Sequence, residues 1–298
     1  MTDHTEQPVT LNRSAGSPAA ADQDAPPLRL LFWETTAACN LACVHCRRLD
    51  VSQEMSRDDL TTEQATALIR SLPEVGRPIL VFSGGEPLMR PDIFDLAEIA
   101  RDAGLPTALA TNGTIMDDRI AQRIVDVGVR RVSMSFDGPD AATHDGFRGI
   151  DGAFDATVRG FNELRSRGMS MQINTTVTKH NYDRMDDMYR LALDLGADAL
   201  HVFMLVPVGC GMELKDHVIL SPDEYENALH WIYDRSLEGE MHLKATCAPH
   251  YFRVMRQRAK DEGRKMPEFA HPHRSMKSDE SASSHGGHSG GYSGGHGN

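Results

Sequence analysis

Residues 28–46 read LRLLFWETTAACNLACVHC, an apolar run followed at once by a cluster of cysteines. The run over 28–36 is short and rich in large apolar residues, which is typical of a buried β-strand. Cys39, Cys43 and Cys46 then form a C-x3-C-x2-C pattern. If the strand belongs to a parallel sheet, the cysteines lie at its carboxyl end, where binding sites gather in such sheets.

Five more apolar runs read as strands, and segments with helical periodicity separate them. The runs cover residues 78–85, 106–113, 129–138, 169–177 and 197–208. Their starts recur at intervals of about 25 to 40 residues, the size of a βαβ unit. Six such units predict a parallel α/β sheet with right-handed crossovers, either an open doubly wound sheet or a partly closed barrel. Thr61 and Gln64 predict a capping box at the start of the first long helix.

Composition narrows the class of protein. The chain has 298 residues and a formal net charge of −12, so nucleic acid is not an expected partner. No run is apolar enough to cross a membrane. Five cysteines at uneven spacing favour a metal or redox site in the reducing cytoplasm over a disulfide framework. Residues 1–27 and the Gly/Ser/His-rich 266–298 are expected to be disordered tails.

Three interpretations of the cysteine cluster compete. Buried cysteines can act as small hydrophobic residues. Zinc could bind with His45 as a fourth ligand, although structural zinc sites usually use two separated ligand pairs. A [4Fe-4S] cluster normally takes four cysteines, and one with three has an iron open to another ligand. The third interpretation explains the spacing best.

The cysteine pattern after the first strand and GGEP at 84–87 after the second together resemble the radical S-adenosylmethionine (radical SAM) superfamily, over residues 28–206. The resemblance implies a partial (β/α)6 barrel. It implies a [4Fe-4S] cluster on Cys39, Cys43 and Cys46 whose open iron binds S-adenosylmethionine. Reductive cleavage of that cofactor would give a 5′-deoxyadenosyl radical, with ferredoxin or flavodoxin as the expected electron donor.

The same resemblance implies contacts to the cofactor near the first two strands. His45 stands where the superfamily usually has an aromatic residue near the adenine. Gly84 and Gly85 would let the backbone approach the methionine ammonium. Glu86 would hold that ammonium or brace the loop. Without the cysteine motif, the same residues would be read as an ordinary turn.

Further contacts are expected at later strand ends, where TNG (111–113) and SFDGP (135–139) also occur. Ser135 and Asp137 would contact the ribose or shape its pocket, and Arg148 would bind the cofactor carboxylate through its planar fork. Asn174 would contact the adenosine. The alternatives are a strand-to-turn aspartate, a surface arginine and a satisfied core asparagine.

Residues 200–256, with FMLVPVGCGM and LKATCAPHYFRVMRQ, carry a narrower resemblance to radical SAM heme synthases. It implies oxidative decarboxylation of iron-coproporphyrin III propionates to give protoheme. A heme d1 relative, a peptide maturase and a non-catalytic iron–sulfur or heme carrier are the alternatives. Residues 207–265 would form a substrate-side extension to the barrel.

A flat substrate edged with carboxylates needs apolar walls and cations at the rim. The expected walls are Met204, Leu205, Val206, Met212, Tyr251 and Phe252. The expected cations are Arg47, Arg48, Lys179, His180, Lys244, His250 and Arg253. His201 or His250 would ligate the porphyrin iron.

The heme synthases continue into a cysteine-rich domain with an auxiliary [4Fe-4S] cluster. Only Cys210 and Cys247 remain here outside the first motif, and neither belongs to a second motif. We therefore expect one cluster per chain, and substrate turnover that depends on a missing segment or on a partner with an auxiliary cluster.

Overall fold

The structure is a computed structural model that describes residues 26–46, 58–206 and 218–265. The expectations for the two tails and for Arg47, Arg48, Cys210 and Met212 lie outside these residues. The chain divides into two compact units, residues 1–251 and 252–298. Of the second unit, the described part is mainly α10 (Tyr251–Asp261).

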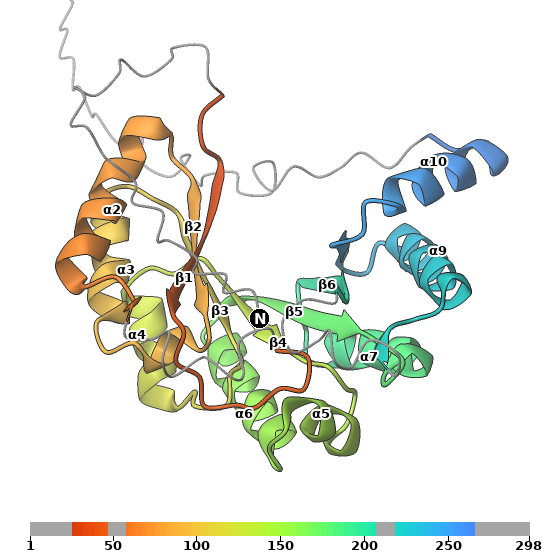
Figure 1. The fold of residues 1–298 in the computed structure, drawn as a ribbon, viewed down its shortest axis with the longest axis horizontal. Coiled ribbons are helices and arrows are strands. Elements are labelled where there is room, and N and C mark those ends of the chain that lie inside the picture. The colour runs from red at the N-terminus through yellow and green to blue at the C-terminus, as the bar shows by residue number, and fades with distance from the viewer. Residues whose placement is uncertain (1–25, 47–57, 207–217, 266–298) are drawn as a thin grey trace, which may run out of the picture. The chain divides into compact units, whose positions relative to one another are not determined.

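The first unit contains a parallel sheet whose seven strands follow chain order from edge to edge. A doubly wound sheet reverses its strand order beside the first strand, and this sheet does not, so the barrel-type arrangement is correct (Figure 1). Among the described residues β1 does not pair with β7, which leaves the barrel partial. The strands are β1 (Leu30–Thr36), β2 (Ile79–Gly84), β3 (Thr107–Thr111), β4 (Arg131–Ser135), β5 (Ser170–Val177), β6 (Ala199–Met204) and β7 (His242–Thr246).

The six predicted strands are confirmed, and β7 is an addition that the sequence analysis missed. Helices cover one face of the sheet (Figure 1). The predicted capping box is present, with Thr61 and Gln64 each bonding the other's backbone at the start of α2. The helices of the first unit are α2 (Thr62–Val75), α3 (Ile93–Asp102), α4 (Asp118–Asp126), α5 (Ala141–Arg148), α6 (Ala153–Ser166), α7 (Met185–Asp194) and α9 (Pro222–Glu238), with short 3-10 turns η2 (Pro87–Met89) and η3 (Tyr182–Arg184).

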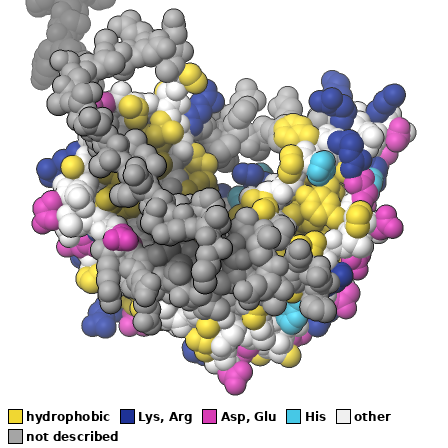
Figure 2. Space-filling view, in the orientation of Figure 1, with side chains coloured by type: hydrophobic (Ala, Val, Ile, Leu, Met, Phe, Trp, Pro, Cys, Tyr) yellow, Lys and Arg dark blue, Asp and Glu magenta, His cyan; other side chains and the backbone are white. Residues whose placement is uncertain are grey.

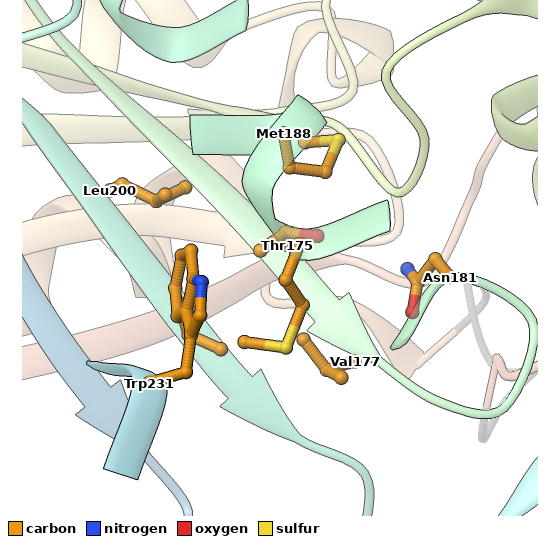
Figure 3. Close-up of a pocket in the computed structure, with 8 residues that line it drawn as sticks. Thr175, Val177, Asn181, Met188, Leu200 and Trp231 are labelled. Carbon is orange, nitrogen blue, oxygen red and sulfur yellow. The ribbon is translucent and has the colours of Figure 1, made fainter. Parts of the chain in front are cut away.

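The two faces of the sheet differ in character. Alternate residues of each strand point to opposite faces, and one set is buried against the helices. Figure 3 shows part of this covered face, where Trp231 of α9 lies near Leu200 of β6 and Met188 of α7 around a small apolar pocket. No helix of the described part of the first unit covers the other face, and we call it the open face.

One expectation about the substrate pocket is corrected by the fold. Met204, expected as a wall of the substrate pocket, pairs in register with Val177 and is only 2% exposed. It belongs to the core under the helices rather than to a pocket wall on the open face. None of the helices in the described ranges has the length and apolarity needed to span a membrane.

Candidate active site

The cysteine loop directly follows β1, as expected. Cys43 is buried, Cys39 and Cys46 are half-buried, and none of the three forms a disulfide with another described cysteine. The sulfurs are close enough to affect one another electrostatically: burial raises the pKa of Cys39, and the neighbouring Cys43 and Cys46 raise it further. Among the described residues, no three His, Cys, Asp or Glu side chains are arranged to hold a single metal ion. The zinc interpretation, with His45 as fourth ligand, therefore gains no support.

The glycine loop after β2 is fastened to the cysteine loop. The Gly85 N–H donates to Thr36 O at 2.7 Å, and the Glu86 N–H donates to Ala38 O at 2.8 Å. A Cβ on Gly84 or Gly85 would overlap these backbone oxygens. The glycines are thus needed to bring two loops together. The methionine ammonium is a hydrogen-bond donor and would need acceptor groups of this loop, and that contact remains a prediction.

Glu86 is completely buried and braces the strand ends. One carboxylate oxygen accepts from Leu88 N (3.1 Å) and Thr111 Oγ1 (2.8 Å), and the other accepts from Asn112 N (2.8 Å). Burial raises the pKa of Glu86, and these hydrogen bonds oppose that rise. Of the two predicted roles, the structure shows the bracing one.

An amide network ties the cysteine loop to the end of β3. The Asn112 side chain donates to Asn40 Oδ1 at 2.9 Å, and Asn40 donates to Thr114 Oγ1 at 2.8 Å. The TNG segment was expected at this edge of the sheet, but no role was predicted for its residues. Asn40, between the first two cysteines, was also missed.

Arg148 joins the cysteine loop to the end of β4. Its Nη1 donates to Cys43 Sγ at 3.6 Å, and its Nη2 lies 2.7 Å from Asp137 Oδ2. Asp137 is fully buried and also accepts the Thr176 N–H at 2.7 Å. Burial alone would raise the pKa of the Asp137 carboxyl, but the Arg148 guanidinium holds it below its usual value. Arg148 is therefore no surface arginine.

The end of α5 holds the third side of the cysteine loop. The Val44 N–H donates to Phe147 O at 3.1 Å. His45 stacks on the Phe147 ring with centroids 4.3 Å apart, and His180 lies against Phe147 at 5.4 Å. His45 is thus packed as an aromatic residue would be. Its Nδ1 is buried without a hydrogen-bond partner among the described residues.

Ser135 and Asn174 lie side by side on the open face. They are paired in register on β4 and β5 and are half-buried. Asn174 Oδ1 accepts from Gln172 Nε2 at 2.7 Å. Asn174 is therefore hydrogen-bonded, and its amide remains on the face that the helices leave free. Contacts of either residue with ribose or adenosine remain predictions.

The arrangement fits a three-thiolate cluster with an additional ligand. Three thiols lie on one loop that β1, β2, β3 and α5 hold in place. Two buried polar atoms beside that loop, His45 Nδ1 and Arg148 Nε, have no hydrogen-bond partner among the described residues. Such orphaned groups are rare unless a ligand meets them. Arg148, His45 and the three cysteines would hold the cluster and S-adenosylmethionine.

Comparison with known proteins agrees with this geometry. The Radical SAM superfamily profile matches residues 33–192, from β1 to within α7. The chain belongs to the radical SAM superfamily, whose members use a [4Fe-4S] cluster and S-adenosylmethionine.

Curated relatives are more specific. AdoMet-dependent heme synthases from Nitratidesulfovibrio vulgaris and Methanosarcina barkeri are each 48% identical to this chain, over 84% and 83% of its length. The matches span 68% and 70% of those proteins. A mycofactocin maturase of Mycolicibacterium smegmatis is 32% identical over 74% of this chain and 56% of its own length.

Solved structures show the same fold at lower identity. The anSMEcpe structure with bound AdoMet has a TM-score of 0.62 and 22% identity, covering 80% of this chain and 68% of that one. Streptococcus suis SuiB, bound to its precursor peptide SuiA, has a TM-score of 0.61 and 16% identity over 78% and 51% of the two chains. At this identity the likeness supports the fold alone.

Proposed function

We propose that this radical SAM enzyme oxidatively decarboxylates propionate side chains of iron-coproporphyrin III to vinyl groups, giving protoheme. The 48% identity to AdoMet-dependent heme synthases over most of the chain carries this proposal. A 35% identical Fe-coproporphyrin III synthase and a 34% identical pre-heme d1 synthase also support a porphyrin-type substrate.

When bound, the cluster and S-adenosylmethionine supply a 5′-deoxyadenosyl radical that takes a hydrogen atom from the substrate. The chain holds the three thiolates on one braced loop. The Arg148 guanidinium donates to Cys43 Sγ and is itself held by Asp137. Hydrogen bonds to cluster sulfur ligands are one means of setting the reduction potential.

The reaction must also transfer one electron to an acceptor. Removal of a hydrogen atom from the propionate carbon β to the carboxylate leaves a carbon radical. Breaking the bond to the carboxylate releases CO2, forms the alkene, and leaves one electron for an acceptor. We propose a one-electron acceptor such as an auxiliary iron–sulfur cluster, on a partner or on a further segment. A ferredoxin or flavodoxin donor and a cytoplasmic location belong to the same proposal.

The test uses protein reconstituted anaerobically with iron and sulfide. Electron paramagnetic resonance of the reduced protein should change on addition of S-adenosylmethionine. Mass spectrometry should then find 5′-deoxyadenosine, and loss of carboxyl groups from iron-coproporphyrin III when an electron acceptor is present. A protein that yields no 5′-deoxyadenosine would be a carrier. Formation of 5′-deoxyadenosine with modification of a peptide, and no change in the porphyrin, would favour the maturase alternative.

A further inference from the structure

The open face of the sheet becomes basic toward β7. Register places Lys244 of β7 beside His201 of β6, and His201 beside Asn174 of β5. His242 lies two residues before Lys244 on the same face, and its ring centroid is 5.9 Å from that of His201. Arg131 of β4 is on the same face, because it pairs with Ser170 and β5 alternates from there to Asn174. We call these four residues, Arg131, His201, His242 and Lys244, the basic row.

Acidic groups do not neutralise the basic row among the described residues. Within residues 26–46, 58–206 and 218–265, neither Arg131 nor Lys244 forms an ion pair. Arg131 Nε donates to Ser170 Oγ at 3.0 Å, and Ser170 donates on to Asp198. Asp198 faces Arg165 as well, at 3.6 Å. The open-face positions of the described strands include one acid, Glu34, on β1 at the opposite edge of the sheet.

Burial lowers the pKa of both histidines of the basic row. Burial lowers the pKa of His201 to about 3, and Lys244, His242 and Arg131 lower it as well. The Gln172 amide donates to Asn174 Oδ1 and lies 2.9 Å from His201 Nδ1. With that amide donating to Nδ1, the ring proton is on Nε2, which can then donate to a carboxylate. The basic row thus has two full cations and imidazole donors between them.

We propose that the basic row binds the carboxylates of the substrate, an inference that rests on the proposed porphyrin decarboxylation. Two observations support it. Within the described ranges Arg131 and Lys244 have no acidic partner on the open face, in a chain of net charge −12. His201 lies directly beside Asn174, and Lys244 lies one strand further along the sheet. Three strand spacings, about 14 Å, separate β4 from β7, and the register places Arg131 four residues nearer the amino-terminal ends of the strands than Lys244. The two cations are therefore far enough apart to bind separate carboxylates of one flat molecule. Figure 2 shows basic and histidine side chains deep in the hollow of this view.

The experiment measures porphyrin binding by absorbance titration of the reconstituted protein. The probes are iron-coproporphyrin III and its tetramethyl ester, which has the same ring and iron but no carboxylate charges. Loss of a charge-assisted hydrogen bond costs about 1.5–3 kcal/mol, so Lys244→Met should weaken binding of the acid roughly tenfold to a hundredfold. Arg131→Met should act similarly, and Lys244→Arg should restore most of the affinity. Neither Met variant should weaken binding of the ester.

The control is Arg119→Gln, at an 88% exposed side chain on α4, which should bind both probes as the original chain does. Circular dichroism and iron content verify folding. If both Met variants bind the acid normally, or lose acid and ester equally, the basic row does not bind carboxylates. If the original chain decarboxylates the porphyrin and the variants do so with unchanged KM, this inference alone fails. If the original chain binds neither probe, the proposed function fails with it.

Discussion

Replacement of Arg148 by Met tests how the cysteine loop is held. The side chain is 8% exposed and faces Asp137, which is 0% exposed. Removing one partner of a buried ion pair costs about 3–5 kcal/mol, because the other charge stays buried and unpaired. For a domain of this size that corresponds to a fall in Tm of roughly 6–20 °C. Loss of the donor to Cys43 Sγ should also reduce iron retention.

The assay is thermal unfolding of the reconstituted protein at pH 7, together with iron and sulfide analysis. The double variant Arg148→Met/Asp137→Asn removes both charges, so it should be more stable than the sum of the two single changes predicts. Arg184→Met is the matched control, because Arg184 makes two ion pairs at the surface and should shift Tm much less. If Arg148→Met unfolds within about 2 °C of the original chain, or the two changes are strictly additive, the buried pair does not hold the loop.

Three further outcomes are expected. Cys39→Ser should abolish the cluster, lowering iron from about four per chain to near zero and stopping 5′-deoxyadenosine formation; about eight irons in the original chain would contradict the single-cluster expectation. Gly85→Ala should lower Tm and iron retention, because the new Cβ would overlap Ala38 O. Gly146→Ala in α5 is the control: its Cβ meets nothing closer than 3.9 Å, so it should be neutral or stabilising. Equal effects of the two changes would show that the contact between Gly85 and Ala38 does not require glycine. Burial lowers the pKa of His144 to about 4, whereas the pKa of histidine in the unfolded chain is about 6.5. The free energy of unfolding should therefore fall as pH drops from 6.5 toward 4. In His144→Gln this dependence on pH should be weaker, and an unchanged dependence would assign it to another group.

The sequence predicted those strands that are marked by a local pattern of apolar residues. β2 and β6 are largely apolar, while β4 and β5 alternate apolar residues on the covered face with polar residues on the open face; both patterns are typical of strands. The missed strand, HLKAT at His242–Thr246, has only Leu243 and Ala245 on the covered side. Its remaining positions are polar because they lie on the open face at the sheet edge, so no apolar run marks it.

The sequence indicated which residues belong to the site, but not which of them contact one another. The cysteine spacing is a local signal, and GGEP follows from resemblance. Arg148 was expected to face the cofactor, yet its partners are Cys43, 105 residues away in sequence, and Asp137. Gly85 was expected to admit a ligand and is required for contact with Ala38. Such long-range pairings are fixed only when the sheet brings the strand ends together.

Because the strands follow chain order across the sheet, the cysteine loop and the basic row are built mainly from different strands. The braced cysteine loop draws on β1 to β4 and α5, whereas the basic row draws mainly on β6 and β7. The superfamily profile ends at residue 192, before both of those strands, while the similarity to heme synthases extends over 250 residues. On the proposed function, the cysteine loop would generate the radical and β6 and β7 would position the substrate, so exchange of those two strands would change the substrate and leave the radical chemistry intact.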